Sequence, residues 1–183
     1  IGGSGTNEGN YIGRAAQAGV QIAGSQAHNS LVRGNRIGFT RTFTTRANGD
    51  GVRIVAGAYQ NTVGGVGAGE GNVISGNSLS GVAIDAGAGN AVRGNIIGLN
   101  PTRGLNAGTG TYGVALFGNA SGTGISDNVI AANTAWGIAA FGNSSGAVIE
   151  RNVIGLRGGS NTANDNTAAG NGQGGIDIES ADN

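Results

Sequence analysis

The hydrophobic pattern of this chain alternates over short segments that each begin with glycine. In these segments the second and fourth residues are aliphatic, and their glycines are Gly19, Gly51, Gly81, Gly113, Gly137 and Gly175. Such alternation is typical of a β-strand with one buried face. No segment of ten or more residues carries a helical stripe, so an all-β fold is expected.

A second pattern recurs between these segments. It is an asparagine followed two residues later by isoleucine, as in Gly94-Asn95-Ile96-Ile97-Gly98. Several copies also carry an aliphatic residue three positions before the asparagine. The equivalent asparagines are Asn10, Asn35, Asn72, Asn95, Asn128 and Asn152.

A unit this small cannot bury its own apolar face, so successive units must stack on one another. The sequence therefore predicts a single-stranded right-handed parallel β-helix, a solenoid of about six to seven coils. Each repeated asparagine is expected at a bend, where its amide hydrogen-bonds to the asparagines above and below in a ladder. We expect residues 1–183 to form one repeat domain. An internal alignment at an offset of 62 residues starts at Ile1 and indicates a module of a longer array.

The connections from the asparagine motif to the glycine-led segments are alternately short and long. The long ones cover residues 39–50, 99–112 and 156–174, and they are expected to leave one corner of the solenoid on every second coil. Long loops on a rigid scaffold are common binding sites. Their candidate binding residues are Arg41, Arg46, Arg103, Tyr112 and Arg157.

Composition narrows the possible partners. Ten arginines balance ten acidic residues and there is no lysine, which argues against nucleic acid and anionic membrane surfaces. No run of about eighteen apolar residues is present, so no membrane insertion is expected. Cys and Met are absent, which excludes disulfides and thiolate metal sites and suits a secreted protein, extracellular or at the cell surface.

Few residues carry obvious chemistry. His28 lies in a polar stretch without an adjacent carboxylate and is interpreted as a surface turn residue. The segment 172–177 weakly resembles a calcium-binding nonapeptide, but a single copy predicts no metal site. No cofactor is expected. Asp85, Asp177 and Glu179 point outward on their strands, and spacing alone does not establish a catalytic carboxylate pair.

Phe117 and Phe141 occupy equivalent outward positions on successive coils, which predicts rings about 5 Å apart. Two hypotheses stay open for this pair. A long loop folds back over the rings as a satellite core, or the rings form a flat platform that stacks on a sugar or on a neighbouring solenoid.

The order of motifs resembles the β-helix repeats of large secreted bacterial proteins in the pectin-lyase-like superfamily. The pattern is Gly-Asn-x-Ile-Gly, a long loop, Gly-Val-x-Ile, and then Gly-Gly-x-x-x-Gly-x-Gly-Asn-Val-Ile-Ser-Gly-Asn. The resemblance covers nearly the whole chain and implies the fold. It does not imply one activity, because that superfamily includes lyases, hydrolases, epimerases, adhesins and non-catalytic spacers.

The lyase signatures of that superfamily, an Asp-His pair and an Arg-x-Pro-x-x-Arg run, are absent from this sequence. We therefore expect a non-catalytic extracellular module that binds carbohydrate or a cell surface, or displays other groups. Its expected partner is a polysaccharide or cell-surface glycan. The alternative is a polysaccharide-processing enzyme with its site on the outer face and long loops. End-to-end or lateral self-association stays open as well.

Overall fold

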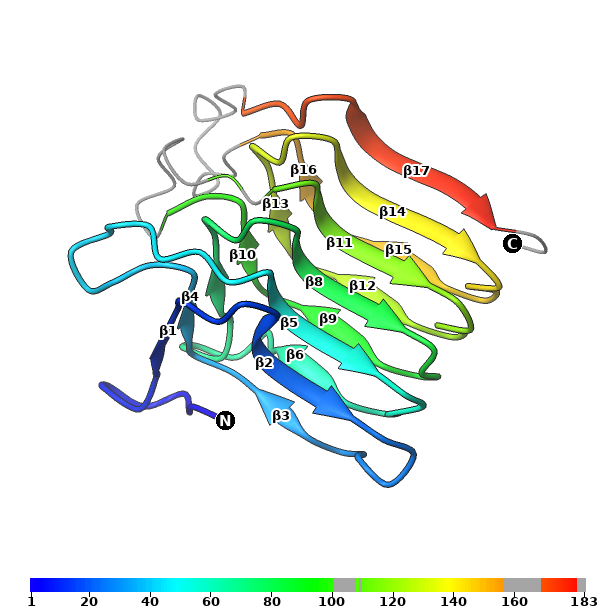
Figure 1. Ribbon diagram of the computed structural model, residues 1–183, viewed down its shortest axis with the longest axis horizontal. Coiled ribbons are helices and arrows are strands. Elements are labelled where there is room, and N and C mark those ends of the chain that lie inside the picture. The colour runs from blue at the N-terminus through cyan, green and yellow to red at the C-terminus, as the bar shows by residue number, and fades with distance from the viewer. Residues whose placement is uncertain (101–107, 109, 157–168, 181–183) are drawn as a thin grey trace.

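A computed structural model describes residues 1–100, 108, 110–156 and 169–180. In these residues the only regular secondary structure is β-strand, and all the strands pair in parallel. They form three sheets that wrap into a right-handed parallel β-helix (Figure 1), which confirms the predicted fold class. No helix in the described part of the chain is long and apolar enough to cross a membrane.

We name the sheets S1, S2 and S3. S1 contains β1 (Tyr11–Ile12), β4 (Arg36–Ile37), β7 (Val73–Ile74), β10 (Ile96–Ile97), β13 (Val129–Ile130) and β16 (Val153–Ile154). S2 contains β2 (Ala18–Ala23), β5 (Asp50–Val55), β8 (Ser80–Asp85), β11 (Tyr112–Phe117), β14 (Trp136–Gly142) and β17 (Gly174–Ser180). S3 contains β3 (Leu31–Val32), β6 (Thr62–Gly64), β9 (Ala91–Arg93), β12 (Gly124–Ser126) and β15 (Val148–Glu150).

The chain passes through S1, S2 and S3 in turn and then returns to S1 one coil higher. In Figure 1 the S2 strands lie side by side from β2 at one end to β17 at the other. Their register places the first aliphatic residue of each glycine-led segment in one column. That column is Val20, Val52, Val82, Val114, Ile138 and Ile176.

Inward side chains from the three sheets fill the interior. A typical coil contributes one isoleucine from S1, two aliphatic residues from S2 and one from S3. In the middle coils these residues are fully buried, as Ile97, Val114, Leu116 and Ile125 illustrate. Each such burial contributes about 1.5–3 kcal/mol, so the repeated aliphatic positions are the main support of the fold.

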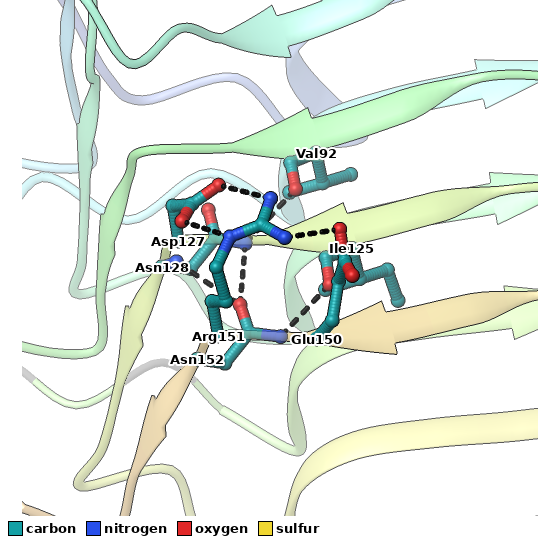
Figure 2. Close-up of polar contacts among 7 residues, drawn as sticks. All are labelled: Val92, Ile125, Asp127, Asn128, Glu150, Arg151 and Asn152. Atoms are coloured by element: carbon teal, nitrogen blue, oxygen red, sulfur yellow. Dashed lines mark hydrogen bonds and ion pairs between the residues drawn. The ribbon is translucent and has the colours of Figure 1, made fainter.

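The predicted asparagine ladder is present at the corner between S3 and S1. From Asn10 to Asn128, each ladder Nδ2 donates to the Oδ1 of the next ladder asparagine at 2.9–3.1 Å. The same Oδ1 accepts the backbone N–H of the preceding asparagine at 2.9–3.0 Å. Figure 2 shows the last pair, Asn128 and Asn152.

Two further ladders were not predicted. At the corner between S1 and S2, Asn48 Nδ2 donates to Asn77 Oδ1 at 2.8 Å, and Asn133 binds Asn171 in the same way. At the corner between S2 and S3, Asn61 Nδ2 donates to Asn90 at 3.2 Å. These asparagines stand at variable distances from the main-ladder asparagines, since Asn48 follows Asn35 by 13 residues whereas Asn77 follows Asn72 by 5. Alignment on the main-ladder asparagine alone therefore does not bring them together, although Asn77, Asn133 and Asn171 each precede the glycine of an S2 segment by four residues.

The ladder between S1 and S2 explains why the S2 segments begin with glycine. A Cβ on Gly113 would lie 2.4 Å from Ile130 Cγ2 and 2.9 Å from Asn133 Nδ2. Gly51 meets an equivalent isoleucine and ladder asparagine at the same distances. Any larger residue would have to displace both the core and the ladder.

Excursions from the coil occur at two corners. The long segment 38–49 and the short segments 13–17, 75–79 and 131–135 connect S1 to S2, in agreement with the predicted alternation. The other two predicted long connections, 99–112 and 156–174, lie partly outside the described residues. Residues 3–10 and 65–72 add glycine-rich loops before S1, which the single-corner prediction omitted. These two loops have matching hydrogen bonds, because Glu8 Oε2 accepts Gly5 N–H at 2.7 Å and Glu70 Oε2 accepts Gly67 N–H at 3.0 Å.

Candidate functional site

Outward positions of S2 form columns that run along the solenoid, because the strands pair in register. One column starts with alanine and valine and continues with larger or charged residues: Ala23, Val55, Asp85, Phe117, Phe141 and Glu179. The neighbouring column contains Ala83, Ala115 and Ala139 in the middle coils. Aromatic and acidic groups therefore share one outward column of S2, and a column of alanines runs beside it.

Phe117 and Phe141 stack as predicted. Their ring centroids are 5.6 Å apart and the ring planes differ by 16°. Tyr112 meets both rings edge-on, with centroids 6.4 Å from Phe117 and 5.7 Å from Phe141. The three rings are half-buried. We call Tyr112, Phe117 and Phe141 the aromatic cluster.

The aromatic cluster differs from an ordinary hydrophobic core in its exposure. Ala115 and Ala139, on the same face, are 0% exposed, whereas the rings remain partly open. The described loop residues build a satellite core elsewhere, since Leu99, Ala131 and Ala169 pack together beside S1. Among the described residues, that satellite core includes neither ring of the stacked pair.

A groove of about 230 Å³ adjoins the aromatic cluster on S2. Its walls come from three successive coils, and they are Asp50, Arg53, Leu79, Ser80, Ala83, Asp85, Thr111, Tyr112 and Phe117. The groove therefore joins an apolar wall to carboxyl, guanidinium and hydroxyl groups, which is the composition of many small-ligand sites.

Asp50 is the most perturbed acid in the groove. Burial raises the pKa of its carboxyl, and this effect is opposed by hydrogen bonding to Ser80 and by the charge of Arg53. Ser80 N–H donates to Asp50 Oδ1 at 3.0 Å, while Arg53 Nε lies 4.0 Å from Asp50 Oδ2. The sequence prediction placed Asp50 in a loop and omitted Arg53, yet both belong to β5. Aligning the glycine-led segments pairs Arg53 with Ala83 and could have placed Arg53 on the outward face of S2.

The two carboxyls of the groove are far apart along the strand direction. Asp50 lies beside Ser80, and Asp85 follows Ser80 by five residues on β8. At the rise of an extended strand this separates the Cα atoms of Asp50 and Asp85 by about 17 Å. Glycoside hydrolysis uses two carboxyls about 5–10 Å apart, so this arrangement favours hydrogen bonding to a ligand over acid–base cleavage.

The remaining predicted site residues divide into two groups. Arg41 and Arg46 lie in segment 38–49 beside Tyr11 of S1 and do not join the aromatic cluster. Arg103 and Arg157 lie outside the described residues. The structure thus brings Tyr112 to the two phenylalanines and places the described loop arginines at a different sheet.

His28 packs against a neighbouring aromatic ring and forms a hydrogen bond. Its ring stacks on Tyr59 with centroids 5.0 Å apart, and its Nδ1 shares a 2.9 Å hydrogen bond with Asn29 Nδ2. In the described part of the chain, no three His, Asp or Glu side chains gather closely enough to hold a metal ion.

No family model, no curated protein and no solved structure matches this chain. The parallel β-helix is therefore established by the strand pairing itself, and function has to be argued from the surface of this molecule.

Proposed function

We propose that this chain is a non-catalytic extracellular module of the pectin-lyase-like type, which binds carbohydrate on the outer face of S2. The observation that carries this proposal is the partly exposed stack of Phe117 on Phe141, with Tyr112 edge-on to both. An aromatic face offers apolar area to the C–H face of a sugar ring, and it loses little conformational entropy when it does so.

The groove beside the aromatic cluster supplies the polar half of such a site. Asp50 and Asp85 offer acceptors to sugar hydroxyls, and Arg53 offers donors. The groove volume of about 230 Å³ is smaller than a drug-sized pocket and is open to solvent, which fits one or two residues of a polymer lying across the coils. A cell-surface glycan or free polysaccharide fits this description.

The alternative is a polysaccharide-processing enzyme on the same face. The wide separation of the groove carboxyls and the missing lyase signatures both weigh against it. A module that binds without cleaving needs only the stacking surface and hydrogen-bonding groups, so it requires no additional chemistry.

The test is affinity electrophoresis through gels containing dextran, mannan, xylan or mixed-linkage β-glucan. We expect the wild-type protein to be retarded by at least one of them, and Phe117→Ala/Phe141→Ala to bind at least tenfold more weakly. Phe43→Ala is the matched control, because it removes another exposed phenylalanine, 48% exposed, from a loop that the S2 groove does not use. The same samples are assayed for new reducing or unsaturated ends, and we expect none.

Retention that is unchanged in the double variant would overturn the platform, and new chain ends would overturn the non-catalytic assignment. A double variant that unfolds would favour the satellite-core hypothesis. Phe117→Leu/Phe141→Leu then separates the two, because leucine keeps apolar volume without a ring. Sedimentation of the same variants reports whether the cluster instead mediates lateral self-association.

A further inference from the structure

Four arginines line the surface around Tyr11 of S1. They are Arg14, Arg36, Arg41 and Arg46. Tyr11 lies on β1 and is 40% exposed, and Arg36 is its register partner on β4. The Arg36 guanidinium carbon lies 5.3 Å from the Tyr11 ring centroid, and that of Arg41 lies 5.7 Å from it.

None of these four arginines forms an ion pair within the described part of the chain. The ion pairs of the described residues involve Arg33, Arg53 and Arg151. The whole sequence has ten arginines and ten acidic residues. Four unpaired positive charges on one surface therefore leave a net charge of −4 for the rest of the chain, since six arginines remain against ten acids. This charge separation is a specific feature of the surface and is hidden by the net charge of zero.

Segment 38–49 is an ordered hairpin that fixes two of the arginines (Figure 1, between β4 and β5). Phe39 bridges Thr45 in antiparallel fashion and is 2% exposed, so it anchors the segment. Arg46 N–H donates to Gly38 O at 2.7 Å, and Arg46 O accepts the N–H of Arg14 at 3.1 Å. Arg14 and Arg46 are thereby held together by the backbone.

Two clefts meet at Tyr11 and Arg41. One, of about 480 Å³, lies among the glycine-rich loops 3–9 and 65–71, Tyr11, Arg36 and Arg41. The other, of about 550 Å³, is lined by Tyr11, Arg14, Phe39, Thr40, Arg41 and Arg46. Because the two clefts share these two residues, they form one continuous surface that we call the Tyr11 groove.

We propose that the Tyr11 groove binds a polyanionic polysaccharide through its carboxylate or sulfate groups. Stacking on Tyr11 holds the guanidiniums of Arg36 and Arg41 flat, which lowers the entropy that ordering them would cost. Their N–H edges stay available for paired hydrogen bonds to oxyanions. Four arginines along two adjoining clefts suit a repeating anionic polymer better than a single small anion.

A polysaccharide fits this surface better than a nucleic acid. The chain carries no overall basic excess, and the described basic patch lies in one place. The Tyr11 ring already contacts two guanidiniums, so it is poorly available for base stacking. The hydroxyls of Thr40, Thr42 and Thr44 cluster on the hairpin, with Thr40 Oγ1 and Thr42 Oγ1 3.0 Å apart, and offer donors and acceptors to sugar hydroxyls.

The experiment compares gels containing dextran sulfate, polygalacturonate or uncharged dextran, and adds a single-stranded oligothymidylate in a separate assay. We expect the wild-type protein to bind a polyanionic glycan, with affinity that falls as salt is raised. Arg36→Gln/Arg41→Gln should bind at least tenfold more weakly with an unchanged melting temperature. Arg93→Gln/Arg151→Gln is the charge-matched control and should bind as the wild type does.

Each outcome decides the proposal. Preference for dextran sulfate identifies sulfate as the bound group, and preference for polygalacturonate identifies carboxylate. Equal losses in the two double variants would reduce the effect to net charge and overturn the site, as would absence of binding to both polyanions. Tighter binding to the oligonucleotide would replace the polysaccharide with a nucleic acid. The Phe117→Ala/Phe141→Ala variant should retain polyanion binding, which separates this groove from the proposed S2 site.

Discussion

Two polar stacks lie next to each other at the corner between S3 and S1 (Figure 2). Asn128 and Asn152 form the inner stack, in which Asn128 Nδ2 donates to Asn152 Oδ1 and to the carbonyl of Val92, both at 2.9 Å. Asp127 and Arg151, each one residue earlier, form the outer stack. Arg151 donates to the two carboxylate oxygens of Asp127 at 2.9 and 3.1 Å.

The difference between the stacks is burial. Asn128 is 1% exposed, whereas the Arg151 side chain is 60% exposed. A buried amide that loses its partner remains unsolvated, but water and salt can replace either partner of an exposed ion pair. Asp127 and Arg151 also have φ of 57° and 53°, at positions where other coils have glycine. The inner stack therefore constrains the residue type much more tightly than the outer stack.

The largest expected effect is the loss of an inner amide. Asn128→Ala should lower the free energy of unfolding by about 1–3 kcal/mol, because the buried backbone N–H of Asn95 would lose its acceptor, Asn128 Oδ1. Urea unfolding measures this loss. Asp127→Gly, one residue away, should leave the midpoint almost unchanged because it also relieves the positive φ. Asn119→Ala is a further control on an exposed turn. Equal losses at Asn128 and Asp127 would contradict the argument from burial.

A methyl group beside the second ladder should have the next largest effect. Gly113→Ala places a Cβ against Ile130 and Asn133 and should cost about 1–3 kcal/mol through overpacking. Gly124→Ala is the matched control, because no atom lies within 4 Å of a Cβ there and Ala91 is its register partner. It should be neutral or slightly stabilising. The melting temperatures of both variants test this expectation. An unchanged melting temperature for Gly113→Ala would show that Ile130 and Asn133 can move aside without loss of stability.

The smallest expected effect is the pH dependence of two acids with opposite pKa shifts. The pKa of Asp50 is raised by burial, so its contribution to stability is present below its ordinary pKa of 3.8 and is lost as pH rises through the folded value. The pKa of Asp127 is lowered by hydrogen bonds from Arg151 and Ser126, so its contribution is present above 3.8 and is lost as pH falls through the folded value.

Asp50→Asn should therefore gain stability relative to the wild type as pH is raised from about 4 to 7. Asp127→Asn should be less stable than the wild type at neutral pH, and this difference should shrink below about pH 4. Urea midpoints across this range test both expectations. Slopes of the same sign for the two variants would show that the two carboxyls do not experience opposite environments.

The core residues and the main asparagine ladder were predictable because they repeat along the sequence. Ile97 and Val114 follow a period set by the strand, and the ladder asparagines keep a fixed distance from the isoleucine that follows, so the sequence identifies them without a structure. Asn48 and Asn61 escaped prediction because segments of different length separate them from the main-ladder asparagines, 13 residues from Asn35 to Asn48 but 5 from Asn72 to Asn77. The closed coil places Asn48 at the corner between S1 and S2 and Asn61 at the corner between S2 and S3.

The surface was predictable only where it followed the strand register. Phe117 and Phe141 are outward residues of paired strands, and their stacking follows from the spacing of coils. Arg41 belongs to a hairpin whose path depends on Phe39 being buried, and no period specifies that path. The contact of Arg41 with Tyr11, and with it the Tyr11 groove, required coordinates.

The main ladder also has a direction. In each of its side-chain hydrogen bonds the amide of an earlier coil donates to that of a later coil, from Asn10 through to Asn152. Aligned amide dipoles polarise one another and add, as peptide dipoles do in a helix. The carbonyl ends of these side chains face the first coils, and their N–H ends face the last coils. The solenoid therefore carries an axial dipole along this corner, negative toward the first coils and positive toward the last.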